Sequence, residues 1–339
     1  MMRSLYSGIS GLRNHQTRMD VIGNNIANVN TIGYKTSRVV FQDIFSQSMA
    51  AGAANNMAIP IGGTNPMQIG LGIKLASIDV LHNPSAFQRT DNATDMMVGG
   101  EGFFIVRGPE GDFYTRAGNF SIDDEGYLVT VDGFFVMGYG YDRTGTDDPI
   151  MVRQQELLNE KDLPFDPPRF RYWVEIDEDA ELDCGYSAPL QRIQVRVYFD
   201  PNDDNFFEDP DASDDDPNMP EFVDLFNFAV AKDGSVEVLS NNRKLTIAKI
   251  ALAMFSNPPG LEKAGNSLYR ETNSSGAVQV GLPYDNGAGT VEGGGLEMSN
   301  VDLASEFTDM IVTQRGFQAN SRIITVSDTM LEELINLKR

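Results

Sequence analysis

The sequence has almost none of the residues that build disulfides, metal centres and histidine-based catalytic sites. Among its 339 residues there is one cysteine, Cys184, and there are two histidines, His15 and His82. A single cysteine excludes a disulfide within the chain, and two histidines leave little material for a zinc site or a catalytic triad. This scarcity fits a cytosolic protein, and it equally fits a chain that is exported unfolded.

Long apolar runs are also missing. No stretch approaches the roughly 20 apolar residues that cross a bilayer, so we expect no membrane insertion. The first residues, Met1 to Tyr6, contain neither an apolar core nor a small-residue cleavage site, which is unlike a Sec-type signal peptide. Because apolar residues make up 41% of the chain, we nevertheless expect folded domains with packed cores.

Basic residues are scarce relative to acidic ones. The chain has 26 Lys and Arg against 49 Asp and Glu, a net charge of −23. A chain this acidic repels phosphate backbones, which argues against nucleic-acid binding. Residues 142–221 alone hold 23 acidic and 7 basic residues. We interpret these runs as a solvated face and predict an inserted, acidic outer domain at 145–222, β-rich because Arg192 to Phe199 reads as a strand.

Each end of the chain has the apolar spacing of a helix. The N-terminal stripe favours a helix over about 4–29, capped by Ser4 and stopped by Asn28, Asn30 and Gly33. The C-terminal stripe has a seven-residue repeat, with Asn300 or Ser299 as candidate caps. The two stripes are Leu5, Ile9, Leu12, Met19, Ile22, Ile26 and Val29, and Leu303, Phe307, Met310, Phe317, Ile324, Leu331 and Ile335.

Neither narrow stripe can be buried by its own helix, so we predict that the two terminal helices pair. Polar residues interrupt the predicted seams at Gln16, Gln314, Ser321 and Asp328. A monomer core tolerates such residues poorly, whereas neighbouring copies could satisfy them. We therefore predict that the fourteen stripe residues are self-assembly residues, although an ordinary core helix at each end is the simpler alternative.

Between the helices the apolar period changes to two, which predicts strands. Gly102 to Arg107 and Phe113 to Arg116 form one hairpin, and Asn119 to Thr130 forms a second around an Asp-Asp-Glu-Gly turn. After the acidic segment the same pattern returns at Phe226 to Leu239 and in a longer strand from Leu245 to Phe255. Regular strands with glycine-centred turns favour a sandwich or small barrel.

The fold class predicted is therefore α+β and multidomain. Paired terminal α-helices form a coiled-coil inner layer, a discontinuous all-β domain forms the middle, and the acidic insert lies outermost. The predicted ranges are 1–35 plus 297–339 for the helical domain, 36–70 for an extended connector, 71–144 plus 223–296 for the β domain, and 145–222 for the insert.

The sequence resembles the family of bacterial flagellar rod and hook proteins. Several of its motifs occur in the family's order, and they cover both ends and both halves of the β region. Within the family, the insert and the sequence around Gly23 and Asn300 look more like hook subunits than distal rod subunits. The motifs are Leu5 to Leu12, Met19 to Lys35, Gly102 to Phe104, Tyr114 to Phe120, Asn257 to Leu261, Leu268 to Thr272, Leu296 to Leu303 and Asp309 to Arg315.

The resemblance implies a structural subunit of the flagellar hook, with the distal rod subunit of the basal body as the alternative. Its expected partners are other copies of itself, the flagellar rod, the hook cap, the hook–filament junction proteins and the flagellar type III export apparatus. The resemblance also implies an extracellular hook location, no enzymatic activity and no cofactor.

Three other chemistries compete for the acidic insert. Asp200, Asn202, Asp204, Glu208 and Asp211 fit a calcium loop in part, but position 6 is Asn205 and position 12 is not Glu. Exposed carboxylates rarely have the raised pKa that glycoside hydrolysis needs. Some spirochete members of the family cross-link subunits through a cysteine and a lysine, but the surroundings of Cys184 do not match, so we interpret it as an idle thiol.

A soluble receptor or adhesin is the alternative from another functional class. It predicts a stable monomer in which both terminal helices are ordered without neighbours.

Overall fold

The computed structural model describes residues 2–52, 63–140, 150–156, 170–176, 190–195, 197–198, 222–223, 228–240, 243–285 and 287–337. The chain divides into two compact units. The helical unit comprises Met1–Thr31, Lys35–Asn83 and Ser299–Arg339, and the β unit comprises Ile32–Tyr34 and Pro84–Met298.

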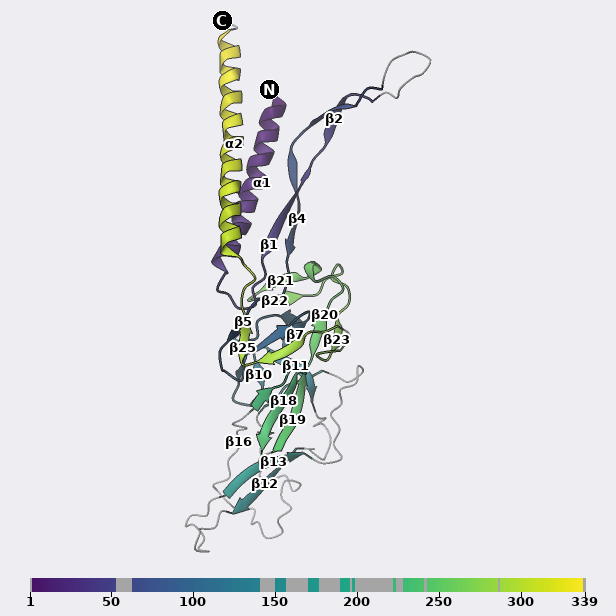
Figure 1. Cartoon of the computed structure of the whole chain (residues 1–339), viewed down its shortest axis with the longest axis vertical. Coiled ribbons are helices and arrows are strands. Elements are labelled where there is room, and N and C mark those ends of the chain that lie inside the picture. The colour runs from purple at the N-terminus through teal and green to yellow at the C-terminus, as the bar shows by residue number, and fades with distance from the viewer. Residues whose placement is uncertain are drawn as a thin grey trace. The chain divides into compact units, whose positions relative to one another are not determined.

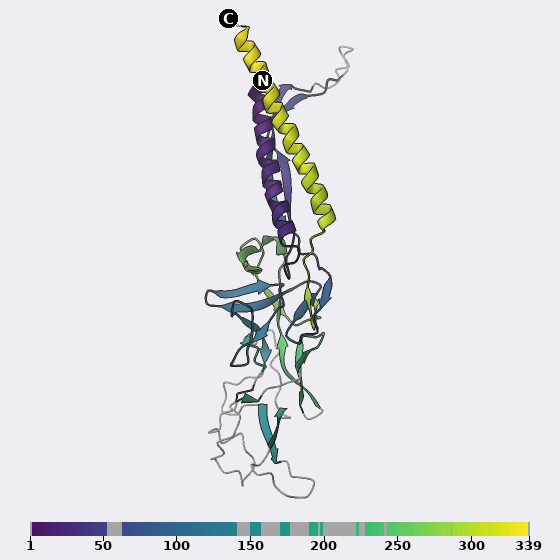
Figure 2. The ribbon, with the colours of Figure 1, turned by 90° about the vertical axis from the view of Figure 1, so that its left-hand side faces the viewer.

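The helical unit contains two long helices that run antiparallel, α1 (Met2–Ala27) and α2 (Leu303–Asn336) (Figure 2). Gly8 of α1 lies beside Ile324, and Arg18 near the other end of α1 forms an ion pair with Asp309 at 3.0 Å. The predicted pairing of the terminal helices within one chain is therefore present.

The predicted helix starts were wrong in detail. Ser4 lies inside α1, and α2 is capped by Asp302, whose side chain accepts a hydrogen bond from the Ala304 N–H. The amide of Asn300 is occupied elsewhere, because it accepts from the Thr36 N–H and donates to the Leu81 carbonyl. Asp302 is also the better cap electrostatically, since its negative charge faces the positive end of the helix dipole.

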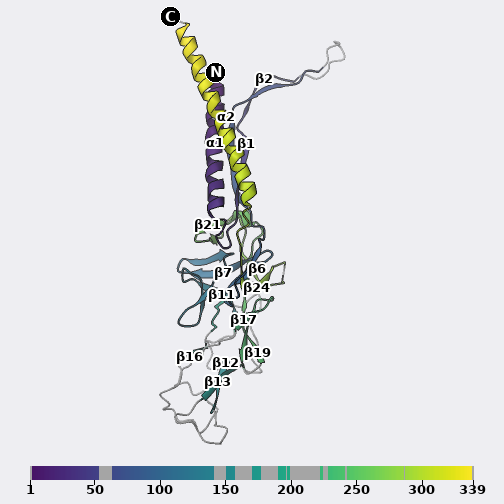
Figure 3. The same ribbon diagram turned by 60° about the vertical axis from the view of Figure 1, so that its left-hand side comes forward.

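The segment predicted as an extended connector forms a hairpin arm. Strand β1 (Ser37–Asp43) pairs with β4 (Ile73–Val80), and β2 (Ser46–Ala50) pairs with β3 (Met67–Gly70), both antiparallel. Residues 71–83, predicted to join the β domain, group with the helical unit because β4 pairs with β1. Figures 1 and 3 show β1 and β4 running alongside α1, where the Asn14 amide donates to the Ile73 carbonyl at 2.8 Å.

The β unit is built on one large sheet. Its strands follow the order β17-β18-β19-β11-β7-β8-β22-β21. These strands are β17 (Phe228–Val230), β18 (Ser235–Ser240), β19 (Arg243–Ile250), β11 (Phe135–Gly140), β7 (Phe103–Gly108), β8 (Gly111–Thr115), β22 (Leu268–Arg270) and β21 (Glu262–Gly265).

Shorter strands and one 3₁₀ turn complete the described part of the β unit. Strand β5 pairs with β25, β6 with β24, β12 with β13 and β15 with β16. Their bounds, with the remaining elements, are β5 (Phe87–Arg89), β6 (Met96–Gly99), β9 (Ser121–Ile122), β10 (Leu128–Val129), β12 (Ile150–Glu156), β13 (Phe170–Ile176), β14 (Gln191–Arg192), β15 (Val197–Tyr198), β16 (Phe222–Val223), β20 (Leu252–Met254), η1 (Pro258–Gly260), β23 (Gln279–Gly281), β24 (Thr290–Gly293) and β25 (Gly295–Glu297).

Strands from before and after the acidic segment share the large sheet, as the predicted β region requires. β11 pairs with β19, and β7 pairs with β20. The single long strand predicted from Leu245 to Phe255 is instead two, because the chain changes partners at Ala251. Ile250 lies opposite Gly138 of β11, whereas Leu252 lies opposite Phe104 of β7.

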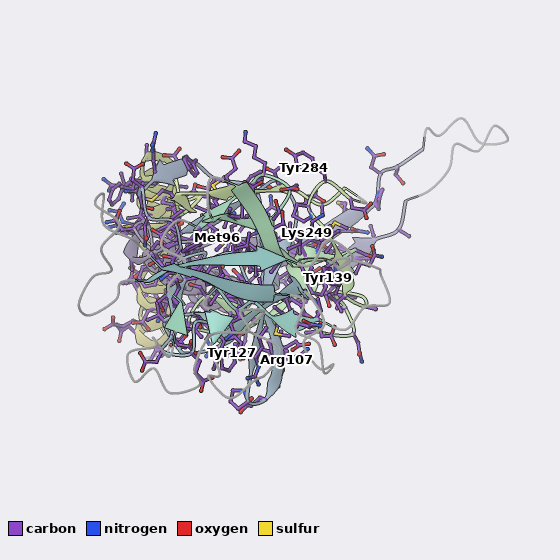
Figure 4. The ribbon with its side chains drawn as sticks, turned by 90° about the horizontal axis from the view of Figure 1, so that it is seen from below. Met96, Arg107, Tyr127, Tyr139, Lys249 and Tyr284 are labelled. Atoms are coloured by element: carbon purple, nitrogen blue, oxygen red, sulfur yellow. The ribbon has the colours of Figure 1, made fainter. Side chains whose placement is uncertain are left out.

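Both faces of β7 are buried, which places the core on both sides of the sheet. Phe104 and Val106 belong to one hydrophobic cluster, and Phe103 and Ile105 belong to the other. Ile193 and Val195 pack into the first cluster. Residues 190–195 therefore contribute to the β core, although the predicted outer domain at 145–222 includes them. Figure 4 shows Met96 of the first cluster and Tyr139 of the second within the β unit.

Candidate self-assembly surface

Small residues bring the two helices close together. A Cβ added at Gly11 would lie 2.7 Å from the side-chain nitrogen of Asn320, and one added at Gly316 would lie 2.9 Å from the ring of His15. Gly8 faces Ile324 in the same way, at 3.5 Å. Glycine at these positions therefore leaves room for side chains of the other helix, which allows the two helices to pack closely.

The inner face of α2 has a different register from the predicted one. Its least exposed side chains recur at alternating steps of four and three residues, whereas Gln314 and Asp328 of the predicted seam are exposed, as is Gln16 on α1. The inner residues are Glu306, Met310, Thr313, Phe317, Asn320, Ile324, Ser327 and Leu331.

Short hydroxyl residues explain this register. The Thr313 hydroxyl donates to the Asp309 carbonyl at 2.7 Å, and the Ser327 hydroxyl donates to the Ile323 carbonyl at 2.8 Å. Each buried hydroxyl is thus satisfied within its own helix. The longer side chain of Gln314 and the charged side chain of Asp328 are exposed to solvent instead.

The predicted stripe residues are only partly covered by the helix pair. Of the fourteen, Ile22 alone is buried. Leu303, Phe307 and Ile335 are exposed, and the other ten are half-buried. The two helices pack together, but apolar stripe residues on either side of their contact stay partly exposed. We call these half-buried and exposed stripe residues the apolar flanks.

A second apolar stripe lies on α2, and we call it the outer stripe. Its side chains are between 44% and 83% exposed. Ile323, Met330 and Leu337 follow one another at seven-residue intervals, a spacing that is visible in the sequence but was masked there by the stronger Met310 to Leu331 repeat. The outer stripe consists of Val312, Ile323, Val326, Met330, Leu334 and Leu337.

Asn25 joins α1, α2 and the hairpin arm. Its buried side-chain amide donates to the Ser37 carbonyl and to the Glu306 carboxylate, both at 3.0 Å, and accepts from the Ser37 N–H at 3.1 Å. Burial raises the pKa of Glu306, and the hydrogen bond from Asn25 opposes that rise. A single asparagine therefore fixes the base of the helical unit through groups on three elements.

His15 lies where α1 meets both α2 and the arm. Its ring is edge-on to Phe41 of β1, with 6.2 Å between the ring centroids, and it faces Gly316 of α2. Burial, together with the nearby charge of Arg18, lowers the pKa of His15. This contact therefore favours the neutral form of the imidazole.

The β unit contains a cavity of about 420 Å³ whose arginines have structural partners. Arg107 and Tyr127 both line it, and both are labelled in Figure 4. Arg107 is held by Asp112 at 2.7 Å, and the Arg192 guanidinium lies over the Phe135 ring, 4.2 Å from its centroid. These contacts occupy the cavity's cationic groups.

The remaining predicted sites fall elsewhere. The calcium candidates Asp200, Asn202, Asp204, Glu208 and Asp211, and also Cys184, lie outside the described residues. Within the described ranges, no group of three or more His, Cys, Asp or Glu is placed to hold a metal ion. In the same part of the chain, no helix is long and apolar enough to span a membrane.

Family models match the chain in three places. Residues 5–35 match a model described as "Flagella basal body rod protein", and residues 97–181 match "Flagellar hook protein FlgE/F/G D1 domain". Residues 292–337 match "Flagellar basal body rod FlgEFG protein C-terminal". The first and third of these ranges include most of α1 and all of α2, the two helices that carry the apolar flanks.

Full-length relatives agree with these matches. The chain is 40% identical to the flagellar basal-body rod protein FlgG of Bacillus subtilis, with all of both chains covered. It is 35% identical to the flagellar hook protein FlgE of Borreliella burgdorferi and 32% identical to that of Treponema pallidum, again with all of both chains covered. The chain belongs to the family of flagellar rod and hook proteins and is a structural component of the bacterial flagellum.

Proposed function

We propose that this chain is the hook subunit, which polymerises into a hollow, flexible tube that couples the rod to the filament and transmits torque. The observation that carries the proposal is the apolar surface left on the helix pair. Ten stripe residues are half-buried, three are exposed, and the outer stripe adds six more apolar side chains. Burying one such side chain contributes about 1.5–3 kcal/mol, so contact with further copies of the helical unit is strongly favoured.

A second copy is the occupant that best fits these flanks. The helices leave apolar flanks at both sides of one contact, so one copy's flank can meet the other flank of the next copy. Such head-to-tail surfaces generate rings or helical polymers rather than closed dimers. The terminal helices then form an inner coiled-coil layer around a channel.

The distal rod subunit is the second candidate. It is favoured by the match to the FlgG protein of Bacillus subtilis, which aligns over 341 positions, close to the length of this chain. The spirochete hook proteins align over 443 and 465 positions, so they contain segments that this chain lacks. The acidic segment 145–222 favours the hook, because wet, charged outer surfaces form weak contacts that can be remade as the tube bends.

The other partners proposed are the flagellar rod, the hook cap and the hook–filament junction proteins. We also propose export through the flagellar type III apparatus. A chain with a single cysteine has no internal disulfide to obstruct passage as an unfolded polymer.

A charge placed in the outer stripe tests polymerisation directly. We expect Val326→Glu to abolish tube formation while leaving the circular dichroism of the β unit unchanged, because a carboxylate cannot be buried unpaired between helices. Gln318→Glu is the matched control, since it adds the same charge on α2 at an exposed position outside the stripe. Tubes of normal yield from Val326→Glu would contradict the proposal.

Electron microscopy of the wild-type polymer separates the two candidates. A curved, flexible tube identifies a hook subunit, and a straight, stiff one identifies a distal rod subunit. Removal of residues 1–30 should leave the β unit folded and prevent polymerisation in both cases.

A further inference from the structure

The β unit contains a buried ion pair that the proposed function does not use. The Arg116 guanidinium lies 3.5 Å from the Glu297 carboxylate, and their side chains are 2% and 0% exposed. Arg116 also donates to the carbonyls of Val98 at 3.2 Å and Gly100 at 2.8 Å. Burial lowers the pKa of Arg116, and the charge of Glu297 opposes that shift.

Such a pair is a poor source of stability. The cost of removing both charges from water can equal or exceed their attraction, and apolar residues of similar volume often serve as well. What a buried pair does supply is a fixed geometry, because each partner must stay within reach of the other. The residues gathered around it are therefore informative.

Glu297 holds the segments by which the chain enters and leaves the β unit. The chain crosses between the two units after Thr31, Tyr34, Asn83 and Met298. Beside these crossings, the Ser85 N–H donates to the Glu297 carboxylate at 3.1 Å, and the Gly33 N–H donates to the Glu297 carbonyl at 2.8 Å. The Met298 N–H donates to the Ala86 carbonyl at 3.1 Å.

Gly33 packs closely against the backbone beside Arg116. Its φ is +65°, and a Cβ there would lie 2.7 Å from the backbone nitrogen of Ala117, the residue after Arg116. Only glycine combines that backbone conformation with so close an approach. The loop at 32–34 therefore rests directly on the backbone that presents Arg116.

We propose that Arg116 and Glu297 are positioning residues that seat all the crossing segments on the β unit. In a polymer that transmits torque, force passes between the two units through these segments, so the seat is where the β unit takes up the load. The load-bearing role rests on the proposed function, whereas the seat itself does not.

Hydrogen exchange of the full-length chain tests the seat. Glu297→Gln keeps the size and the acceptor oxygen but leaves the buried charge of Arg116 uncompensated. We expect the amides of Gly33, Ser85 and Met298 to exchange roughly tenfold faster or more, while those of β7 stay protected. Asp112→Asn is the control, because it breaks the more exposed 2.7 Å pair with Arg107 in the same unit and should leave the crossings unchanged.

Wild-type exchange rates at the crossings of Glu297→Gln would overturn the proposal. Should this variant unfold, Gly33→Ala disturbs the seat from the loop side, against the backbone at Arg116 and Ala117, and leaves both charged side chains in place. Faster exchange at 32–34, 85 and 298 with β7 intact supports the seat, whereas unchanged exchange contradicts it. Loss of β7 protection in both variants also contradicts it, because the pair would then be an ordinary core element.

The stiffness of the polymer tests the load-bearing role separately. Tubes of Glu297→Gln should have a persistence length shorter than wild type by roughly twofold or more, since a released crossing adds compliance to every subunit. Equal stiffness would remove the load-bearing role. Failure of the wild-type chain to form any tube would contradict the proposed function, and the exchange result would still decide the seat.

Discussion

At the scale of single residues, several family motif positions are explained by backbone contact. Gly118, in the motif from Tyr114 to Phe120, lies against the backbone of Met96, and a Cβ there would be only 1.7 Å from the Met96 carbonyl oxygen. The Met96 N–H donates to the Gly118 carbonyl at 3.0 Å. The glycine is thus required by the approach of two backbones.

We expect Gly118→Ala to lower the free energy of unfolding of the β unit by about 3 kcal/mol, because rigid backbone must move to admit the methyl group. Urea denaturation followed by tyrosine fluorescence measures the change. Gly281→Ala is the matched control, since nothing lies within 4 Å of its added Cβ. Similar stability of the two variants would show that Met96 shifts without cost.

The neutral packing of His15 predicts a pH dependence of the helical unit. Its pKa in the folded state lies below the ordinary 6.5, so the unfolded chain binds a proton first as the pH falls. The contribution of His15 to the free energy of unfolding therefore has its full value above about pH 6.5 and decreases as the pH drops below it. The raised pKa of Glu306 acts in the opposite direction as the pH falls.

Denaturation at pH 7.5 and 5.5, followed by the helical circular dichroism signal, checks this expectation. The wild type should lose more stability between the two values than His15→Gln, which retains His82 and every carboxylate. An equal loss in both proteins would exclude His15 as the source.

At the scale of elements, polar side chains decide how the helices and the arm fit together. Asn25 donates to Glu306 and to the arm, and Asn300 bridges Thr36 and Leu81. Asn300 in this way connects the residue before β1 and the residue after β4 to the segment just before α2. The asparagines of both terminal motifs are therefore structural residues of one unit.

Asn25→Asp should destabilise the helical unit by about 2–4 kcal/mol, because it removes a buried donor and sets a carboxylate beside Glu306. Adding Glu306→Gln should recover part of the loss by restoring a donor. Thermal melts followed by circular dichroism measure both effects. Asn24→Asp, at an exposed position one residue earlier, should change stability by less than about 0.5 kcal/mol. No recovery in the double variant would refute the pairing.

The sequence could predict which elements exist better than which faces they turn inward. The period of seven predicted both helices, but two heptad registers share Met310, Phe317, Ile324 and Leu331. The choice between them depends on short hydroxyls and on glycines of the partner helix, which only the paired structure brings together. The arm is hard to predict for a similar reason, because β1 ends at Asp43 and its partner β4 begins only at Ile73.

At the scale of the whole molecule, the split order of segments was predictable and the unit boundaries were not. The strand patterns on both sides of the acidic segment predict one β region, and β11 pairs with β19 across that segment. The helical unit takes 35–83 because pairing of β1 with β4 outweighs closeness in sequence to the β strands. Ile193 and Val195 joined the core because apolar residues within a charged segment still seek burial.

The net charge of −23 should make polymerisation sensitive to salt. Copies repel one another over a screening length of roughly 30 Å at 10 mM salt and about 8 Å at 150 mM. We expect the critical concentration, measured by sedimentation, to fall as salt rises over this range. Replacing Asp214, Asp215 and Asp216 by Asn should flatten the dependence. A critical concentration that rises with salt would instead indicate attractive ion pairs between copies.

The pairing of α1 with α2 also determines when the helical unit can fold. Along the chain, α1 comes before the hairpin arm and the β unit, and α2 comes after them. The close contact of Gly8 and Gly11 with Asn320 and Ile324 cannot form until the final segment has emerged. A chain that stops before α2 thus has α1 without its partner helix. Only a chain that includes α2 can form the helix pair.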